Sequence, residues 1–84
     1  MKITLKLYAT LSDLLPPQAR DNRIEIEVDA TVRVADILAR FQIPPPLAHL
    51  VLLNGVFLDA DKRGQPGLIQ AGDVLAVWPP VAGG

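Results

Sequence analysis

Two segments of the chain alternate between apolar and polar residues with the two-residue period of a half-buried β-strand. These segments are residues 2–8 and residues 23–28. Glu25 and Glu27 point outward in the second segment, where they could lie beside the lysines of the first segment in an antiparallel pair. The inward positions of the first segment are Ile3, Leu5 and Leu7. We therefore expect two neighbouring strands at the start of the fold.

A helical period follows the second strand. Its apolar residues recur at i, i+3, i+4 and i+7, which places them on one face of a helix: Val34, Ile37, Leu38 and Phe41. Thr31 is a suitable N-cap, and the three prolines at 44–46 prevent the helix from continuing. Residues 9–15 hold a shorter helical turn, which Pro16 and Pro17 stop.

The second half of the chain reads mostly as strands. Residues 47–53 and 56–58 form a hairpin around Asn54-Gly55, a pair that favours a type I′ turn. A polar excursion at 59–67 then leads to a last strand at 74–78. This order predicts an α+β fold on the β-grasp, or ubiquitin-like, plan, with one main helix on a mixed sheet of four or five strands. In this plan the first and last strands lie side by side and parallel at the centre.

Composition limits the functions that such a domain can have. The sequence has 84 residues, 50% of them apolar and 20% charged, as expected of one soluble globular domain with little interior for a catalytic cavity. Cysteine is absent, and a single histidine excludes a multi-histidine metal site, so we expect no metal and no bound cofactor. A formal charge of -1 does not favour nucleic acid or a membrane surface. No apolar run approaches the roughly 20 residues that span a bilayer, and we expect a cytoplasmic protein.

Side-chain motifs offer little chemistry. The segment that begins at Asp59 resembles the start of a calcium loop, but Arg63 and Gln70 stand where oxygen ligands are required. His49 lies within an apolar run and is expected to be a residue on the sheet surface rather than a catalyst. The chain has no phosphate-binding glycine loop, so any nucleotide chemistry would take place in a partner.

Two predicted strands are apolar at consecutive positions, so both faces of the sheet are apolar there. Because one helix covers only one face, the other face is covered either by loops or by a partner protein. For the second case we expect partial exposure of four residues that would dock a partner: Val51, Leu53, Val77 and Trp78.

The last six residues combine stiffness with small size. Pro79 and Pro80 lack amide donors, so they end sheet pairing and direct an extended tail away from the domain at 1–78. Val81 and Ala82 provide small apolar contacts. Gly83-Gly84 would let a carboxylate enter a channel that is too narrow for other residues. A carboxylate becomes an acyl donor most simply after attack on the α-phosphate of ATP, which would have to occur in a partner enzyme.

The sequence from 71 to 84 resembles the end of the MoaD/ThiS family of sulfur carriers, and of the small subunit of molybdopterin synthase in particular. The specific part is Pro-Pro-Val-Ala-Gly-Gly at 79–84. The resemblance implies that Gly84 is adenylated by an E1-like MoeB/ThiF-type enzyme, which uses ATP. A sulfurtransferase or another persulfide donor would then convert it to a thiocarboxylate. The tail would insert into the large subunit of molybdopterin synthase, in a heterotetramer, where catalysis takes place.

Three other functions fit the same residues. One is a ThiS-like carrier for thiazole synthesis or another sulfur pathway, although the Pro79-Pro80 pair is not typical of thiazole carriers. Another is a ubiquitin-like modifier that forms amide bonds with lysines of target proteins. The last is a β-grasp interaction module with an inert tail.

Overall fold

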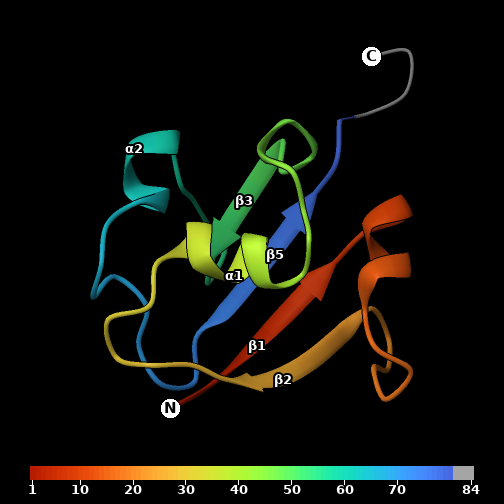
Figure 1. The fold of residues 1–84 in the computed structure, drawn as a ribbon, viewed down its shortest axis with the longest axis horizontal. Coiled ribbons are helices and arrows are strands. Elements are labelled where there is room, and N and C mark those ends of the chain that lie inside the picture. The colour runs from red at the N-terminus through yellow and green to blue at the C-terminus, as the bar shows by residue number, and fades with distance from the viewer. Residues whose placement is uncertain (81–84) are drawn as a thin grey trace.

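The computed structural model describes residues 1–80. Its elements follow one another as five strands with four short helices between them (Figure 1). In chain order they are β1 (Lys2–Leu7), the 3₁₀ helix η1 (Ala9–Leu14), β2 (Arg23–Glu27), α1 (Val34–Arg40), the 3₁₀ helix η2 (Pro45–Leu47), β3 (Leu50–Leu53), β4 (Val56–Phe57), α2 (Ala60–Arg63) and β5 (Val74–Trp78).

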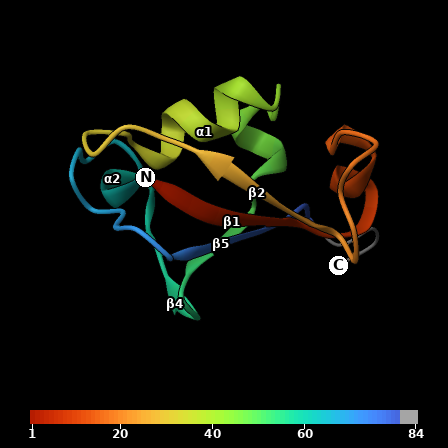
Figure 2. The same ribbon diagram turned by 90° about the horizontal axis from the view of Figure 1, so that it is seen from below.

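The five strands form one mixed sheet in the order β2-β1-β5-β3-β4. β1 and β5 are parallel at its centre, while β2 pairs antiparallel with β1 and β3 pairs antiparallel with β5 (Figure 1). α1 crosses one face of this sheet (Figure 2). The predicted β-grasp plan is thereby confirmed, including the parallel contact between the first and last strands.

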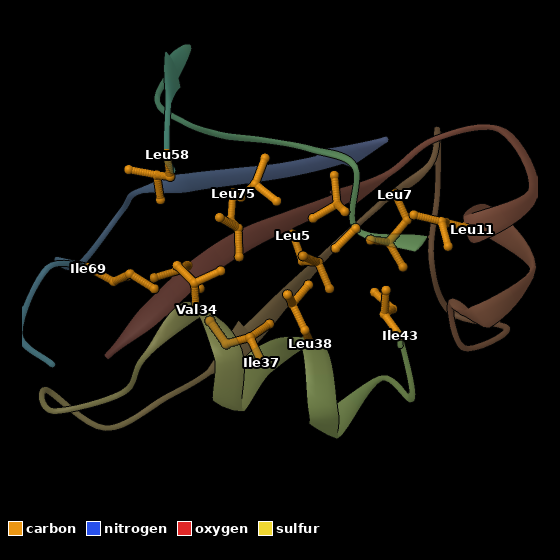
Figure 3. Packing of buried hydrophobic residues seen from close by; sticks show 14 of the residues in the cluster. Leu5, Leu7, Leu11, Val34, Ile37, Leu38, Ile43, Leu58, Ile69 and Leu75 are labelled. Carbon is orange, nitrogen blue, oxygen red and sulfur yellow. The ribbon is translucent and has the colours of Figure 1, made fainter. Parts of the chain in front are cut away.

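The core lies between the sheet and α1. Side chains from alternate positions of β1 and β5 meet one face of α1, and residues from η1 and the later loops close the two ends (Figure 3). The members with no more than 2% exposure include Ile3, Leu5, Leu7, Leu11, Val34, Ile37, Val51, Ile69, Leu75 and Val77. No polar or charged residue of the described part is buried, so packing of apolar side chains supplies the stability.

α1 has a defined cap at each end. At its N-terminus the Asp36 carboxylate accepts a hydrogen bond from the backbone N–H of Arg33 at 2.9 Å. At its C-terminus Gln42 has a φ of 60°, and the Ile43 N–H donates to the Leu38 carbonyl at 2.8 Å, the pattern of a Schellman motif. Arg33 is therefore the N-cap in place of Thr31, because the carboxylate at the third helical position captures its amide.

The predicted Asn54-Gly55 turn joins β3 to β4, and both residues have positive φ, at 52° and 83°. The Asn54 side chain also fixes the start of β5. Its Oδ1 accepts from the Val74 N–H at 2.8 Å, and its Nδ2 donates to the Asp73 carboxylate at 2.9 Å. The turn is thus tied to the strand that leads to the end of the chain.

Two segments differ from the sequence prediction. The first part of the strand predicted at 47–53 is taken by η2 and an extended link, and β3 begins only at Leu50. The polar excursion contains α2, which Asp59 caps by accepting from the Lys62 N–H at 3.0 Å. In the part of the chain that the structure describes, every helix falls short of the length and apolarity needed to cross a membrane.

Candidate functional site

The end of β5 is held on both sides. The rings of Trp78 and Tyr8 stack with their centroids 4.2 Å apart and their planes 3° from parallel, which ties the end of β5 to the end of β1. On the other side the His49 N–H donates to the Trp78 carbonyl at 3.0 Å. The Tyr8 N–H donates to the Val77 carbonyl at 3.1 Å. Contacts on both sides therefore hold Trp78 in place, directly before Pro79.

Pro79 and Pro80 follow this fixed point and lie outside any strand, as their missing N–H groups require. A residue that precedes a proline is restricted to extended backbone, so Trp78 and Pro79 together have few conformations. Three of the predicted tail-threading residues, Val81, Ala82 and Gly83, lie outside the described residues. So does Gly84, the predicted reactive residue.

The sheet face opposite α1, which we call the outer face, carries the side chains that alternate with the core positions. Cross-strand registers place Leu52 opposite Ala76, and Ala76 opposite Lys6. The small Ala76 side chain leaves a hollow of about 360 Å³ between larger neighbours. The residues around the hollow are Lys6, Tyr8, Leu52, Asn54, Gly55, Val74, Ala76 and Trp78. Trp78 thus belongs both to the base of the tail and to the outer face.

The predicted exposure of Val51 and Val77 is wrong. These two residues pair with each other across β3 and β5, and both are fully buried in the core that faces α1. Leu53 is partly exposed but packs against the same core. Because successive side chains of a strand alternate between faces, Val77 cannot share a face with Trp78. Of the four predicted docking residues, only Trp78 lies on the outer face.

Sequence reasoning missed the residues that do form the apolar part of the outer face. They come from β3, β4, β5 and the residue after β1, and they are Leu50, Leu52, Phe57, Val74, Ala76 and Tyr8. Phe57 is the most exposed among them, at 55%. The strands β3 and β5 are apolar at every position, so no alternation in the sequence shows which side chains face α1. The register against β1, whose alternation is clear, resolves this ambiguity.

His49 and the segment that begins at Asp59 were the two side-chain candidates in the sequence, and the structure shows where each lies. His49 is exposed and is the residue directly before β3, so it is not part of the strand. The Asp59 carboxylate is occupied as the cap of α2. Among residues 1–80, no three side chains of His, Asp or Glu are grouped so that they could hold a metal ion.

The chain is similar to several solved structures over its whole length. SAMP1 from Haloferax volcanii is 28% identical with a TM-score of 0.67, and each chain is covered completely. The Haloferax volcanii HVO 2177 protein is 26% identical with a TM-score of 0.74, over 100% of this chain and 87% of that one. A chain from the complex of subunits 1 and 2 of the Helicobacter pylori molybdopterin-converting factor is 19% identical with a TM-score of 0.58, over 100% of both chains, and shows the fold alone.

A search of the curated proteins finds no match. The model of the ThiS family, in contrast, matches residues 5–84. That match includes the second half of β1, all of β2, β3, β4 and β5, the stacked Tyr8 and Trp78, and the sequence Pro-Pro-Val-Ala-Gly-Gly that follows Trp78. This chain is a member of the ThiS family and has its ubiquitin-like β-grasp fold.

Proposed function

We propose that this protein is a sulfur carrier whose reactive group is the main-chain carboxylate of Gly84. The observation that carries the proposal is the ThiS family match, which continues through the tail to Gly84 itself. The arrangement at the end of β5 supports it, because Trp78 is fixed by Tyr8 and His49 and the two prolines stiffen the exit from the domain. In this proposal the catalytic groups belong to partner proteins. The carrier and its partners act in the cytoplasm.

The chemistry follows from the poor reactivity of a carboxylate. One carboxylate oxygen of Gly84 attacks the α-phosphate of ATP in an E1-like MoeB/ThiF-type enzyme, and pyrophosphate leaves. The sulfur of a persulfide then attacks the carbonyl carbon of the acyl adenylate, and AMP leaves. A thiol then attacks the donor-side sulfur of the resulting acyl disulfide and forms a new disulfide with it, and the thiocarboxylate of Gly84 is the leaving group.

Molybdenum-cofactor synthesis is the pathway that we propose for the sulfur. The Pro79-Pro80 pair before Val-Ala-Gly-Gly supports this choice, since it resembles the ending of the small subunit of molybdopterin synthase. In this pathway the tail inserts into the large subunit, and two carriers supply the two sulfurs of the dithiolene. A ThiS-like role in thiazole synthesis uses the same activation and differs in the acceptor.

A second candidate function is protein modification. SAMP1, which is 28% identical, is named a small archaeal modifier protein. Modification starts from the same acyl adenylate, but the final nucleophile is a lysine amine and the product is an amide. The two functions therefore share every step that involves Gly84 until the adenylate is consumed.

Removal of Gly84, or replacement of Gly83 by Phe, tests the role of the tail. We expect both variants to lose adenylation, measured as ATP–pyrophosphate exchange with the MoeB/ThiF-type enzyme of the same organism. Gln65→Phe is the matched control, because it adds a bulky side chain at an exposed position away from the tail, and it should keep the exchange activity. Circular dichroism should show the same fold in all three variants. Adenylation of Gly83→Phe at the wild-type rate would contradict the proposed threading of the tail.

A further inference from the structure

One row of side chains crosses the outer face, with one residue from each strand. Cross-strand registers place these residues opposite one another in the order Phe57 (β4), Leu52 (β3), Ala76 (β5), Lys6 (β1) and Arg23 (β2). The row is apolar over its first three positions and cationic over its last two. Its apolar half contains the hollow above Ala76, and Lys6 lies at the rim of that hollow.

The cationic end of the row is an unfavourable arrangement for the protein alone. Lys6 and Arg23 are direct cross-strand partners. Met1 and Val28 exchange two backbone hydrogen bonds, so they are a hydrogen-bonded pair of the antiparallel ladder between β1 and β2. Hydrogen-bonded and non-hydrogen-bonded pairs alternate along such a ladder. Lys6 and Arg23 are therefore a non-hydrogen-bonded pair, in which the Cα atoms are about 4.5 Å apart. Like charges at such a position destabilise a sheet.

The neighbouring acids do not compensate these charges by direct contact. Glu25 is opposite Thr4, two pairs along the ladder and therefore next on the same face, and it lines a hollow with Arg23 without forming an ion pair with it. Within residues 1–80 the ion pairs join the Met1 amino group to Glu27 and Arg33 to Asp36, so neither Lys6 nor Arg23 takes part in one. A third cation is close, because Arg20 forms backbone hydrogen bonds with Arg23 in both directions and lines a hollow of about 310 Å³ with it.

We propose that the row is a two-part docking site for a protein partner that presents an acidic side chain beside an apolar one. The carboxylate would lie between Lys6 and Arg23, and the apolar side chain would fill the hollow above Ala76. Neighbouring strands are about 4.8 Å apart, so the two positions are separated by roughly 7 Å, which is the distance between residues i and i+2 of an extended segment.

Charge and shape select this occupant among others. Nucleic acid would match the cations but offers no apolar group for the hollow, and the formal charge of the whole chain is -1. A purely apolar partner would leave Lys6 and Arg23 desolvated and unpaired, which costs free energy. The inference rests on the proposed function for the identity of the partner, which we take to be the MoeB/ThiF-type adenylating enzyme.

Charge reversal at Lys6 gives a test in which folding and docking respond in opposite directions. Lys6→Glu creates an opposite-charge pair with Arg23, so the urea midpoint should not fall. The same change should raise the Kd for the adenylating enzyme by roughly tenfold or more, because the new carboxylate at position 6 would repel the acidic side chain of the partner. Lys62→Glu, which makes the same charge change on α2, should leave the Kd within about twofold of wild type.

A second variant separates the apolar half of the site from the charged half. Ala76→Leu fills the hollow without a change in charge. We expect its Kd for the adenylating enzyme to be higher than that of the wild type, and to change with salt concentration as the wild-type Kd does. For Lys6→Glu, the increase of this Kd with salt concentration should become smaller or change sign. Calorimetric titrations at two salt concentrations measure both effects, and pyrophosphate exchange in the same samples reports adenylation.

The outcomes distinguish this inference from the proposed function. Normal adenylation, with equal Kd values for wild type, Lys6→Glu and Lys62→Glu, overturns the docking site and leaves the proposed function in place. Binding that Lys6→Glu weakens, without adenylation of Gly84 in the wild type, overturns the proposed function and supports the docking site. Binding of the wild-type protein to a generic DNA duplex with an affinity equal to that for the enzyme would also overturn the inference.

Discussion

The glycines of the described region fall into two groups by backbone conformation. Gly55, Gly67 and Gly72 have φ between 77° and 84°, the left-handed region in which a side chain is strained. Gly64 ends α2 with a φ of -92°, which any residue adopts. None of the first three has a neighbour within 4 Å of the place where a Cβ would be, so strain alone decides the cost of a substitution there.

Gly72→Ala and Gly64→Ala form a matched pair. We expect Gly72→Ala to lower the free energy of unfolding by about 1 kcal/mol, because Ala must adopt a left-handed conformation in the turn before β5. Gly64→Ala should be neutral or stabilising by up to about 1 kcal/mol, since it mainly restricts the unfolded chain. Urea denaturation measures both values. Equal effects of the two substitutions would contradict the assignment of strain to Gly72.

Single residues also show where sequence reasoning failed for the site. Trp78 and Val77 were both expected to face a partner, although adjacent residues of a strand lie on opposite faces. The alternation rule alone excludes one of the two. The choice between them required the register of β5 against β1, which is a contact between residues about 70 positions apart and leaves no trace in local composition.

At the scale of the elements, local signals identified most of the fold. The alternation of β1 and β2, the apolar face of α1 and the Asn54-Gly55 turn each predicted the element that is present. The boundaries that were wrong depend on competing hydrogen bonds. Arg33 replaces Thr31 as the cap of α1 because Asp36 captures its amide, and η2 replaces the start of the predicted third strand in a proline-rich segment.

The cap of α1 predicts a dependence of stability on pH. Hydrogen bonds from Arg33 hold the pKa of Asp36 below its ordinary value of 3.8. A carboxyl group with a lowered pKa in the folded state stabilises the protein above that ordinary value, and the contribution is lost as the pH falls through the folded pKa. Because Asp36 and Arg33 are exposed, the effect is small and screened by salt.

Asp36→Asn tests this cap. We expect the variant to be less stable than wild type at neutral pH, and the gap in the free energy of unfolding to shrink as the pH falls below about 4. High salt should reduce the part of the gap that comes from the Arg33–Asp36 ion pair. A gap that is constant between neutral and acidic pH would show that the charge of Asp36 has no part in the cap.

Residues 1–80 form one β-grasp domain that offers little side-chain chemistry of its own. With no cysteine and a single histidine in the sequence, nucleophilic and metal-based catalysis have few candidate residues. The proposed function assigns reactivity to the main-chain carboxylate of Gly84 and assigns to the domain the tasks of presenting the tail and binding partners. The order of strands and one main helix predicts the α+β class, whereas the arrangement of the strands in the sheet is predicted mainly by the resemblance to the MoaD/ThiS family.

The intact mass of the protein shows directly whether its C-terminal carboxylate becomes a thiocarboxylate. The protein would be incubated with ATP, the MoeB/ThiF-type enzyme of its organism, a persulfide donor and a thiol, and compared with the variant that lacks Gly84. We predict that the mass of the wild-type chain increases by the difference between one sulfur and one oxygen, and that the variant stays unmodified. An unmodified wild-type mass while the same enzyme adenylates another carrier in a parallel sample would contradict the sulfur-carrier function.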